Sequence, residues 1–193
     1  MSCISKILSC VSLCTAMPQE TKMPNYNWPQ AIHADNMRME FVTNNSNAFR
    51  AICDMYQLDQ AELAQELETM AIWCIYNESN QPIGAIQLDY YHTLENFEKQ
   101  VSDKPLAKKL FESKKFLEIS YALTDENHGK GLGSKAVKTF IDLALTTTWG
   151  KHIYAVVDED NPASIKILEK NGFSYLGNYI HEKTQDNTRV YSL

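Results

Sequence analysis

The chain has 193 residues, of which 44% are hydrophobic, and its formal net charge at pH 7 is −6. This length suffices for one domain with a sizeable core, and the negative charge argues against a nucleic-acid-binding surface as the main function. No apolar run approaches the length of a membrane span, so we expect none. A mildly acidic protein would sooner attract a cationic small molecule or peptide.

We expect residues 1–35 to form a poorly structured segment and linker, followed by a single folded domain over residues 36–193. The stretch 1–17, MSCISKILSCVSLCTAM, has one lysine and then a short apolar run, so a secretory signal peptide is one interpretation. Serines interrupt that run and its cleavage site is poor, which favours a plain tail of a cytoplasmic protein. Cys3, Cys10 and Cys14 are either acylation candidates or ordinary thiols of this tail.

The total of five cysteines is odd, and no C-x-x-C pair exists. Neither a disulfide framework nor a zinc site is therefore indicated, and we expect no metal.

The first elements of the domain are predicted as a short strand over residues 39–43 and two helices over 48–56 and 60–70. Strands over 71–76 and 83–91 follow, and the turn-rich NESNQP between them is typical of a hairpin. The polar segment 93–115 is expected to contain a helix. Five of its lysines indicate a solvent-exposed face of this helix: Lys104, Lys108, Lys109, Lys114 and Lys115.

The central stretch, residues 116–133, reads FLEISYALTDENHGKGLG. Its first eight residues are apolar and aromatic apart from Glu118, which predicts a mostly buried strand. After a polar turn, three glycines alternate with other residues, and an amphipathic helix is predicted from about Ser134. Glycines allow a ligand to approach the backbone closely, and a helix start offers N–H groups and partial positive charge. A strand, a glycine loop and a helix start in this order therefore suit the binding of a pyrophosphate group.

The remaining elements are a buried strand over 152–157, a helix over 163–170 that ends at Asn171-Gly172, and a hairpin over 174–182 and 188–193. Helices and strands thus alternate through most of the domain. The sequence predicts an α/β fold with a mixed central sheet of six to seven strands flanked by about four to five helices.

From Glu118 onward the chain resembles the acetyl-CoA signature of the GCN5-related N-acetyltransferase (GNAT) superfamily, Q/R-x-x-G-x-G/A after a strand. The dinucleotide pattern G-x-G-x-x-G and the nucleotide-triphosphate pattern G-x-x-x-x-G-K-[ST] both fail here. Downstream, Asn161-Pro-Ala-Ser164 and Glu169-Lys-Asn-Gly-Phe173 look like the superfamily's N-x-x-S…K-x-G-F segment, particularly in its ribosomal-protein N-terminal acetyltransferase branch. His128 stands where the family usually has Gln or Arg.

The resemblance implies a GNAT-like fold and direct transfer of an acetyl group from acetyl-CoA, as co-substrate, to a primary amine in a ternary complex. It places the pantetheine arm along the central strand, the pyrophosphate at the glycine loop, and the thiol near the next helix start. The cofactor-binding residues implied are Tyr121, Ala122, Leu123, His128, Gly129, Lys130, Gly131, Leu132, Gly133, Ser134, Asn161 and Ser164. The lysines of segment 93–115 are a further option for the 3′-phosphate of the cofactor.

Two residues are implied as catalytic, Glu118 and Ser164. Glu118 is the only acid in its strand, where burial would raise the pKa of its carboxyl group toward that of a useful general base. The alternatives are a Glu118 that points to solvent or pairs with a lysine, and a water chain that removes the proton instead. The tyrosine acid of many members is absent, because Leu168 occupies its position. Ser164 and Asn161 are then the candidates near the cofactor's sulfur, although Asn161-Pro162 is also a good helix start.

The expected partners are a small-molecule amine or a peptide or protein N-terminus, with no nucleic acid and no membrane span, and a homodimer stays open. Acids on the first two helices favour a cationic acceptor: Asp54, Asp59, Glu62, Glu66 and Glu68. An ordinary solvated helix face explains them equally well. The alternative function from another class is a binding module that holds acetyl-CoA or CoA without turning it over.

Overall fold

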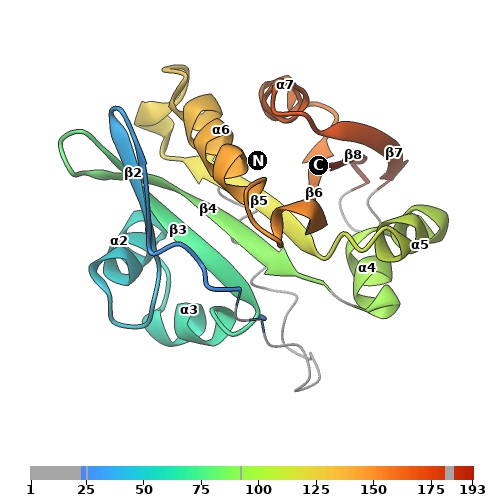
Figure 1. The fold of residues 1–193 in the computed structure, drawn as a ribbon, viewed down its shortest axis with the longest axis horizontal. Coiled ribbons are helices and arrows are strands. Elements are labelled where there is room, and N and C mark those ends of the chain that lie inside the picture. The colour runs from blue at the N-terminus through green and yellow to red at the C-terminus, as the bar shows by residue number, and fades with distance from the viewer. Residues whose placement is uncertain (1–22, 25, 92, 181–184) are drawn as a thin grey trace. The chain divides into compact units, whose positions relative to one another are not determined.

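The computed structural model describes residues 23–24, 26–91, 93–180 and 185–193. The described residues form two compact units: the first is made of those up to Leu88 with Ser120–Phe140, and the second of those within Asp89–Ile119 and Ile141–Leu193. Over the described residues, the units contain eight strands of mixed direction and six α-helices. Figure 1 shows most of these elements with their labels. The α/β fold is therefore confirmed, with a larger sheet and one more helix than the sequence predicted.

The strands of the first unit pair in the order β1-β2-β3-β4-β5. They are β1 (Ala31–Ala34), β2 (Met37–Phe41), β3 (Met70–Asn77), β4 (Pro82–Tyr90), which ends in the second unit, and β5 (Leu117–Leu123), which enters this unit at Ser120. Both β1 and β3 run antiparallel to β2, with Met39 opposite Ile32 on one side and Ile75 on the other.

Strand β1 lies inside the stretch that we expected to be a linker. It escaped prediction because it is four residues long and only Ile32 is fully buried. The residues before it are held by Trp73, whose indole N–H donates to the Pro29 carbonyl at 2.9 Å. The Trp28 ring also meets the Trp73 ring edge to face, with centroids 5.6 Å apart.

The helices of the first unit are α2 (Asn47–Tyr56), α3 (Gln60–Glu66) and the first part of α6 (Leu132–Ala144). Ser46 caps α2 by accepting the Phe49 N–H, and Asp59 caps α3 in the same manner. Helix α3 is shorter than the predicted 60–70, because the chain enters β3 at Met70. The apolar faces of α2 and α3 pack on β3 in one core cluster, which also includes Ala85 and Ala122.

The second unit holds α4 (Leu94–Gln100), α5 (Lys104–Glu112), the start of β5, β6 (Ile153–Asp158), α7 (Pro162–Lys170), β7 (Ser174–Ile180) and β8 (Asn187–Ser192). Its strands pair in the order β5-β6-β8-β7. Strands β5 and β6 pair in parallel, whereas β8 runs antiparallel to both β6 and β7. The end of the predicted strand over 174–182 lies outside the described residues.

Segment 93–115 forms two helices rather than one, because Asp103 and Pro105 start a new helix. The Asp103 carboxylate accepts the Leu106 N–H at 2.8 Å. Helices α4 and α5 lie side by side (Figure 1) and form a core cluster with β6, β7 and β8. Within the described part of the chain, no helix is long and apolar enough to cross a membrane.

Candidate active site

The glycine loop of the first unit joins β5 to α6 through a short 3-10 turn, Asp125–Asn127. Gly129 and Gly131 have φ values of +72° and +74°, which side chains rarely adopt. A Cβ atom built on either glycine would meet nothing within 4 Å, so there is room beside the loop backbone. Helix α6 begins at Leu132, two residues earlier than predicted, and its first bond runs from the Lys135 N–H to the Gly131 carbonyl at 3.1 Å.

The ring of His128 closes this loop onto its own strand. Its Nε2 lies 3.0 Å from the Leu123 carbonyl oxygen, to which it donates when it carries the proton. The buried Asn127 adds a second tie, from its side-chain amide to the Thr124 hydroxyl at 2.9 Å. The residue that departs from the family pattern therefore shapes the loop, although about half of its side chain stays exposed.

Strands β4 and β5 approach each other unusually closely at Gly84. A Cβ atom on Gly84 would lie 2.3 Å from the Ala122 carbonyl oxygen and 2.9 Å from the Leu123 Cα atom. The Tyr56 hydroxyl donates to the same Ala122 carbonyl at 3.4 Å. Sequence reasoning missed this contact, for which the only signal was a lone glycine inside an apolar strand.

The other predicted residues of the first unit follow the chain from β5 into α6. Ala122 and Leu123 are buried and Tyr121 is half-buried, whereas Lys130 is exposed beside the two glycines. Leu132, Gly133 and Ser134 form the first turn of α6 and are half-buried. The residues predicted to bind the pyrophosphate, 128–134, thus form the loop before α6 and its first turn.

Glu118 lies in the second unit, in the part of β5 that pairs with β6. The parallel ladder has two pairs, Leu117 with Ile153 and Glu118 with Tyr154. The Glu118 side chain is only 4% exposed, so the alternative in which it points to solvent is wrong. The Tyr154 hydroxyl donates to Glu118 Oε2 at 3.2 Å. Burial, followed by the nearby Glu118 charge, raises the pKa of Tyr154 well above its usual value.

Asn161 and Ser164 stand at the start of α7, as predicted. The Asn161 side-chain oxygen accepts the Ser164 N–H at 3.1 Å, and Pro162 occupies the first helical position. The helix-cap interpretation of this motif is confirmed. At the other end, Gly172 has φ +86°, and the Phe173 N–H donates to the Leu168 carbonyl at 3.2 Å. Leu168 and Phe173 are both buried.

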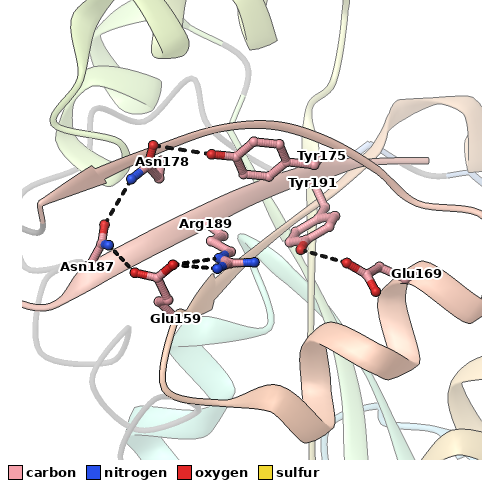
Figure 2. Close-up of polar contacts among 7 residues, drawn as sticks. All are labelled: Glu159, Glu169, Tyr175, Asn178, Asn187, Arg189 and Tyr191. Carbon is pink, nitrogen blue, oxygen red and sulfur yellow. Dashed lines mark hydrogen bonds and ion pairs between the residues drawn. The ribbon is translucent and has the colours of Figure 1, made fainter.

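A polar network that the sequence did not reveal fixes the loop before α7 to β8 (Figure 2). The Glu159 N–H donates to the Asn187 carbonyl at 2.8 Å, and its carboxylate accepts hydrogen bonds from the side chains of Asn187 and Arg189. The bond from Arg189 lowers the pKa of the Glu159 carboxyl group. Nearby, the Tyr191 hydroxyl donates to Glu169 Oε1 at 3.3 Å. The network thereby helps to orient the start of α7.

The lysines of segment 93–115 mostly form the solvated face that their spacing predicted. Lys104, Lys108, Lys109 and Lys114 are exposed. Lys115 differs, because its ammonium group donates to the Lys151 carbonyl at 2.8 Å and partial burial lowers its pKa.

The acids that the sequence assigned to the first two helices have mixed roles. Asp59 is a helix cap, whereas Asp54, Glu62 and Glu68 are exposed. Glu66 is buried and lines, with Gln87 and apolar side chains, a cavity about the size of one water molecule. Asp59 therefore has a structural explanation, and burial removes Glu66 from an acidic surface.

Comparison with known proteins gives one family match and several relatives. A family model described as an acetyltransferase (GNAT) domain matches residues 18–174. The spermidine N(1)-acetyltransferase of Escherichia coli K12 is 35% identical over 65 residues, which are 34% of this chain and 35% of that protein. The chain thus matches about a third of the length of its curated relatives.

Solved structures with the same fold cover more of the chain. A Vibrio cholerae spermidine N-acetyltransferase chimera superposes with a TM-score of 0.59 at 16% identity, over 82% of this chain and 96% of the other. The Salmonella typhimurium acetyltransferase that modifies the N-terminal serine of ribosomal protein L7/L12 superposes with a TM-score of 0.56 at 11% identity. The match covers 84% of this chain and 98% of the other. These likenesses establish the fold. Since the family model spans well over half of the sequence, the chain belongs to the GNAT family of acetyltransferases.

Proposed function

We propose that this protein transfers an acetyl group from acetyl-CoA to a primary amine. The observation that supports it best is the glycine loop, in which two left-handed glycines leave open space beside the backbone just before the first turn of a 13-residue helix. Such a helix start favours negative charge. Membership of the GNAT family supports acetyl-CoA as the ligand of this loop.

In this proposal the residues from His128 to Ser134 hold the pyrophosphate, and the backbone of Tyr121, Ala122 and Leu123 holds the pantetheine arm. The ladder between β5 and β6 is two pairs long and ends at Glu118, which supports a role for the following residues in binding a ligand. Asn161 and Ser164 are the candidates for the pantetheine amides and the sulfur atom. One relative of the same fold was solved in complex with coenzyme A.

The reaction needs a donor for the thioester oxygen and a base for the amine. As the amine attacks, negative charge develops on the thioester oxygen, and a backbone N–H near Ser120 or Tyr121 would stabilise it. The proton that leaves the nitrogen passes to the Glu118 carboxylate. Because Glu118 is buried, a water molecule is the natural carrier between them. The departing thiolate takes its hydrogen bond from the Ser164 hydroxyl.

The acceptor is either a polyamine or a protein N-terminus. Relatives named as spermidine acetyltransferases favour the first, and neighbours that modify ribosomal protein L7/L12 favour the second. The exposed Asp54, Glu62 and Glu68 would attract a cation of either kind. Spermidine and a short peptide with an N-terminal serine are therefore the two acceptors to test first.

Thermal unfolding with acetyl-CoA, CoA or ATP tests the cofactor assignment. A ligand at 100 times its Kd stabilises the folded state by about 2.7 kcal/mol, which corresponds to an increase in Tm of roughly 5–10 °C. We expect this increase with acetyl-CoA and CoA and none with ATP. If neither CoA species raises the Tm, the loop is only architectural and the proposed function is wrong.

Release of free thiol in the presence of each acceptor then separates an enzyme from a binding module. Turnover with spermidine or the peptide supports the enzyme, whereas binding without turnover favours a protein that only senses or stores the cofactor. Glu118→Gln should lower kcat and leave the affinity for acetyl-CoA unchanged, because it keeps the side-chain shape and removes the base. An unchanged rate at every pH would remove Glu118 from the mechanism.

A further inference from the structure

The contact between Glu118 and Tyr154 joins two side chains that are far apart in the sequence and almost inaccessible to water. They stand opposite each other in the β5–β6 ladder, and Tyr154 is 0% exposed. A buried phenol requires an acceptor for its O–H group, and a carboxylate is a strong one. The 3.2 Å hydrogen bond therefore helps to orient the Glu118 carboxylate.

The surroundings of Tyr154 hold its ring in place. It belongs to the apolar cluster of the second unit, and its centroid lies 5.7 Å from that of Phe97. The side chains that α4, α5 and the turn between them add to this cluster are Phe97, Val101, Leu106, Ala107 and Leu110. A donor fixed in this way has little freedom to turn to another partner.

The ionisable groups that act on Tyr154 come from three strands. They are Glu118 on β5, Asp89 on β4 and Tyr179 on β7, all of which are buried. Burial, followed by the negative charge of Glu118, raises the pKa of Tyr154 well above its usual value, which favours the protonated phenol. In its contact with Glu118 the Tyr154 hydroxyl is the hydrogen-bond donor.

We propose that Tyr154 is a positioning residue for the reaction: its O–H group orients the Glu118 carboxylate and stabilises the ionised form that accepts the proton of the amine. This inference rests on the proposed function of Glu118 as the base. The proton moves from the amine nitrogen to Glu118, directly or through water, and the phenol keeps its own proton throughout.

Tyr154→Phe tests the inference, because it preserves the ring and removes only the donor. Loss of a hydrogen bond to a charged group should raise the pH at which Glu118 ionises by about one to two units. The acidic limb of the kcat/KM profile should move upward by that amount, while the KM for acetyl-CoA stays unchanged. Carboxyl-carbon NMR titration, with the Glu118 signal assigned by its loss in Glu118→Gln, should show the same displacement without any turnover.

The matched control is Tyr191→Phe, which removes the same kind of bond, from a tyrosine to Glu169 (Figure 2). It should leave the acidic limb and the Glu118 titration where they are. If Tyr154→Phe also leaves both unchanged, Tyr154 does not position Glu118 and the inference is wrong, whether or not the protein transfers acetyl groups. If the NMR titration moves but Glu118→Gln retains full activity, the contact is structural and the assignment of Glu118 as the base fails.

Discussion

Replacing Gly84 by alanine should destabilise the first unit strongly, although the change adds a single methyl group. The Gly84 backbone is not left-handed, so alanine meets no conformational strain there. The added Cβ atom would instead lie 2.3 Å from the Ala122 carbonyl oxygen, where real contacts are at least 3.0 Å. Strands β4 and β5 would have to separate by 0.7 Å or more, the difference between these two distances.

Overpacking of this kind costs about 1–3 kcal/mol, and we expect about 3 kcal/mol because backbone atoms, which move less easily than side-chain ends, stand in the way. For a chain of this size, each 1 kcal/mol changes the Tm by about 2–4 °C. The midpoint of thermal unfolding should therefore fall by roughly 6–12 °C, as measured by circular dichroism.

Gly133→Ala is the matched control, since it makes the same chemical change in helix α6. Its Cβ atom would lie 3.6 Å from Leu123 Cδ1, an ordinary contact, and alanine favours a helix over glycine by about 1 kcal/mol. This variant should match or exceed the wild-type Tm. The reasoning is refuted if Gly84→Ala unfolds at the wild-type temperature, or if both variants lose stability equally.

Three further outcomes follow from local geometry. Gly131→Ala and Gly172→Ala each place a side chain at a positive φ, at a cost of about 1–2 kcal/mol in the free energy of unfolding, but only Gly131→Ala should weaken acetyl-CoA binding in calorimetry. Equal affinities would show that the loop does not contact the cofactor. Asn161→Ala removes the cap of α7 and should lower the free energy of unfolding, measured with urea, by about 1 kcal/mol. Asn161→Asp keeps an acceptor oxygen and should retain most of that stability. If both variants lose stability equally, Asn161 does not act as the cap. The pKa of Glu159 is lower in the folded protein than its ordinary value of 4.5. Ionised Glu159 therefore stabilises the folded state above pH 4.5, and this stabilisation is lost as the pH falls through the lowered pKa. Glu159→Gln should flatten this acidic part of the stability curve, and a curve that stays unchanged would show that Arg189 contributes nothing through Glu159.

The features that the sequence predicted best are those determined by neighbouring residues. The glycine loop, the cap at Asn161 and the stop at Gly172 all depend on backbone conformations that a few adjacent side chains decide. The start of α6 was misplaced because Leu132 and Gly133 carry no strong capping signal. For His128, the sequence showed only that the residue departs from the family pattern. Its role in holding the loop depends on the contact with the Leu123 carbonyl, which only the structure shows.

The features that the sequence could not predict depend on which strands become neighbours. Tyr154 is 36 residues from Glu118, and nothing local to either residue indicates that they face each other across the β5–β6 ladder. The pairing of Glu159 with Arg189 likewise requires the register of the β6–β8 ladder. Periodicity identifies strands, but the order in which they pair arises from the packing of the whole unit.

The short strand β1 has a practical consequence for how the protein is produced. A version that starts at residue 36 would lose β1, the four-residue strand that ends the sheet on this side, and would expose the backbone groups of β2 that pair with it. Very short edge strands limit association between chains, and the longer β2 would become the edge strand instead. It would also remove the Pro29 carbonyl and leave the indole N–H of Trp73 without its acceptor. Shortened versions of this chain that aggregate would therefore report a missing edge strand and no weakness in the rest of the fold.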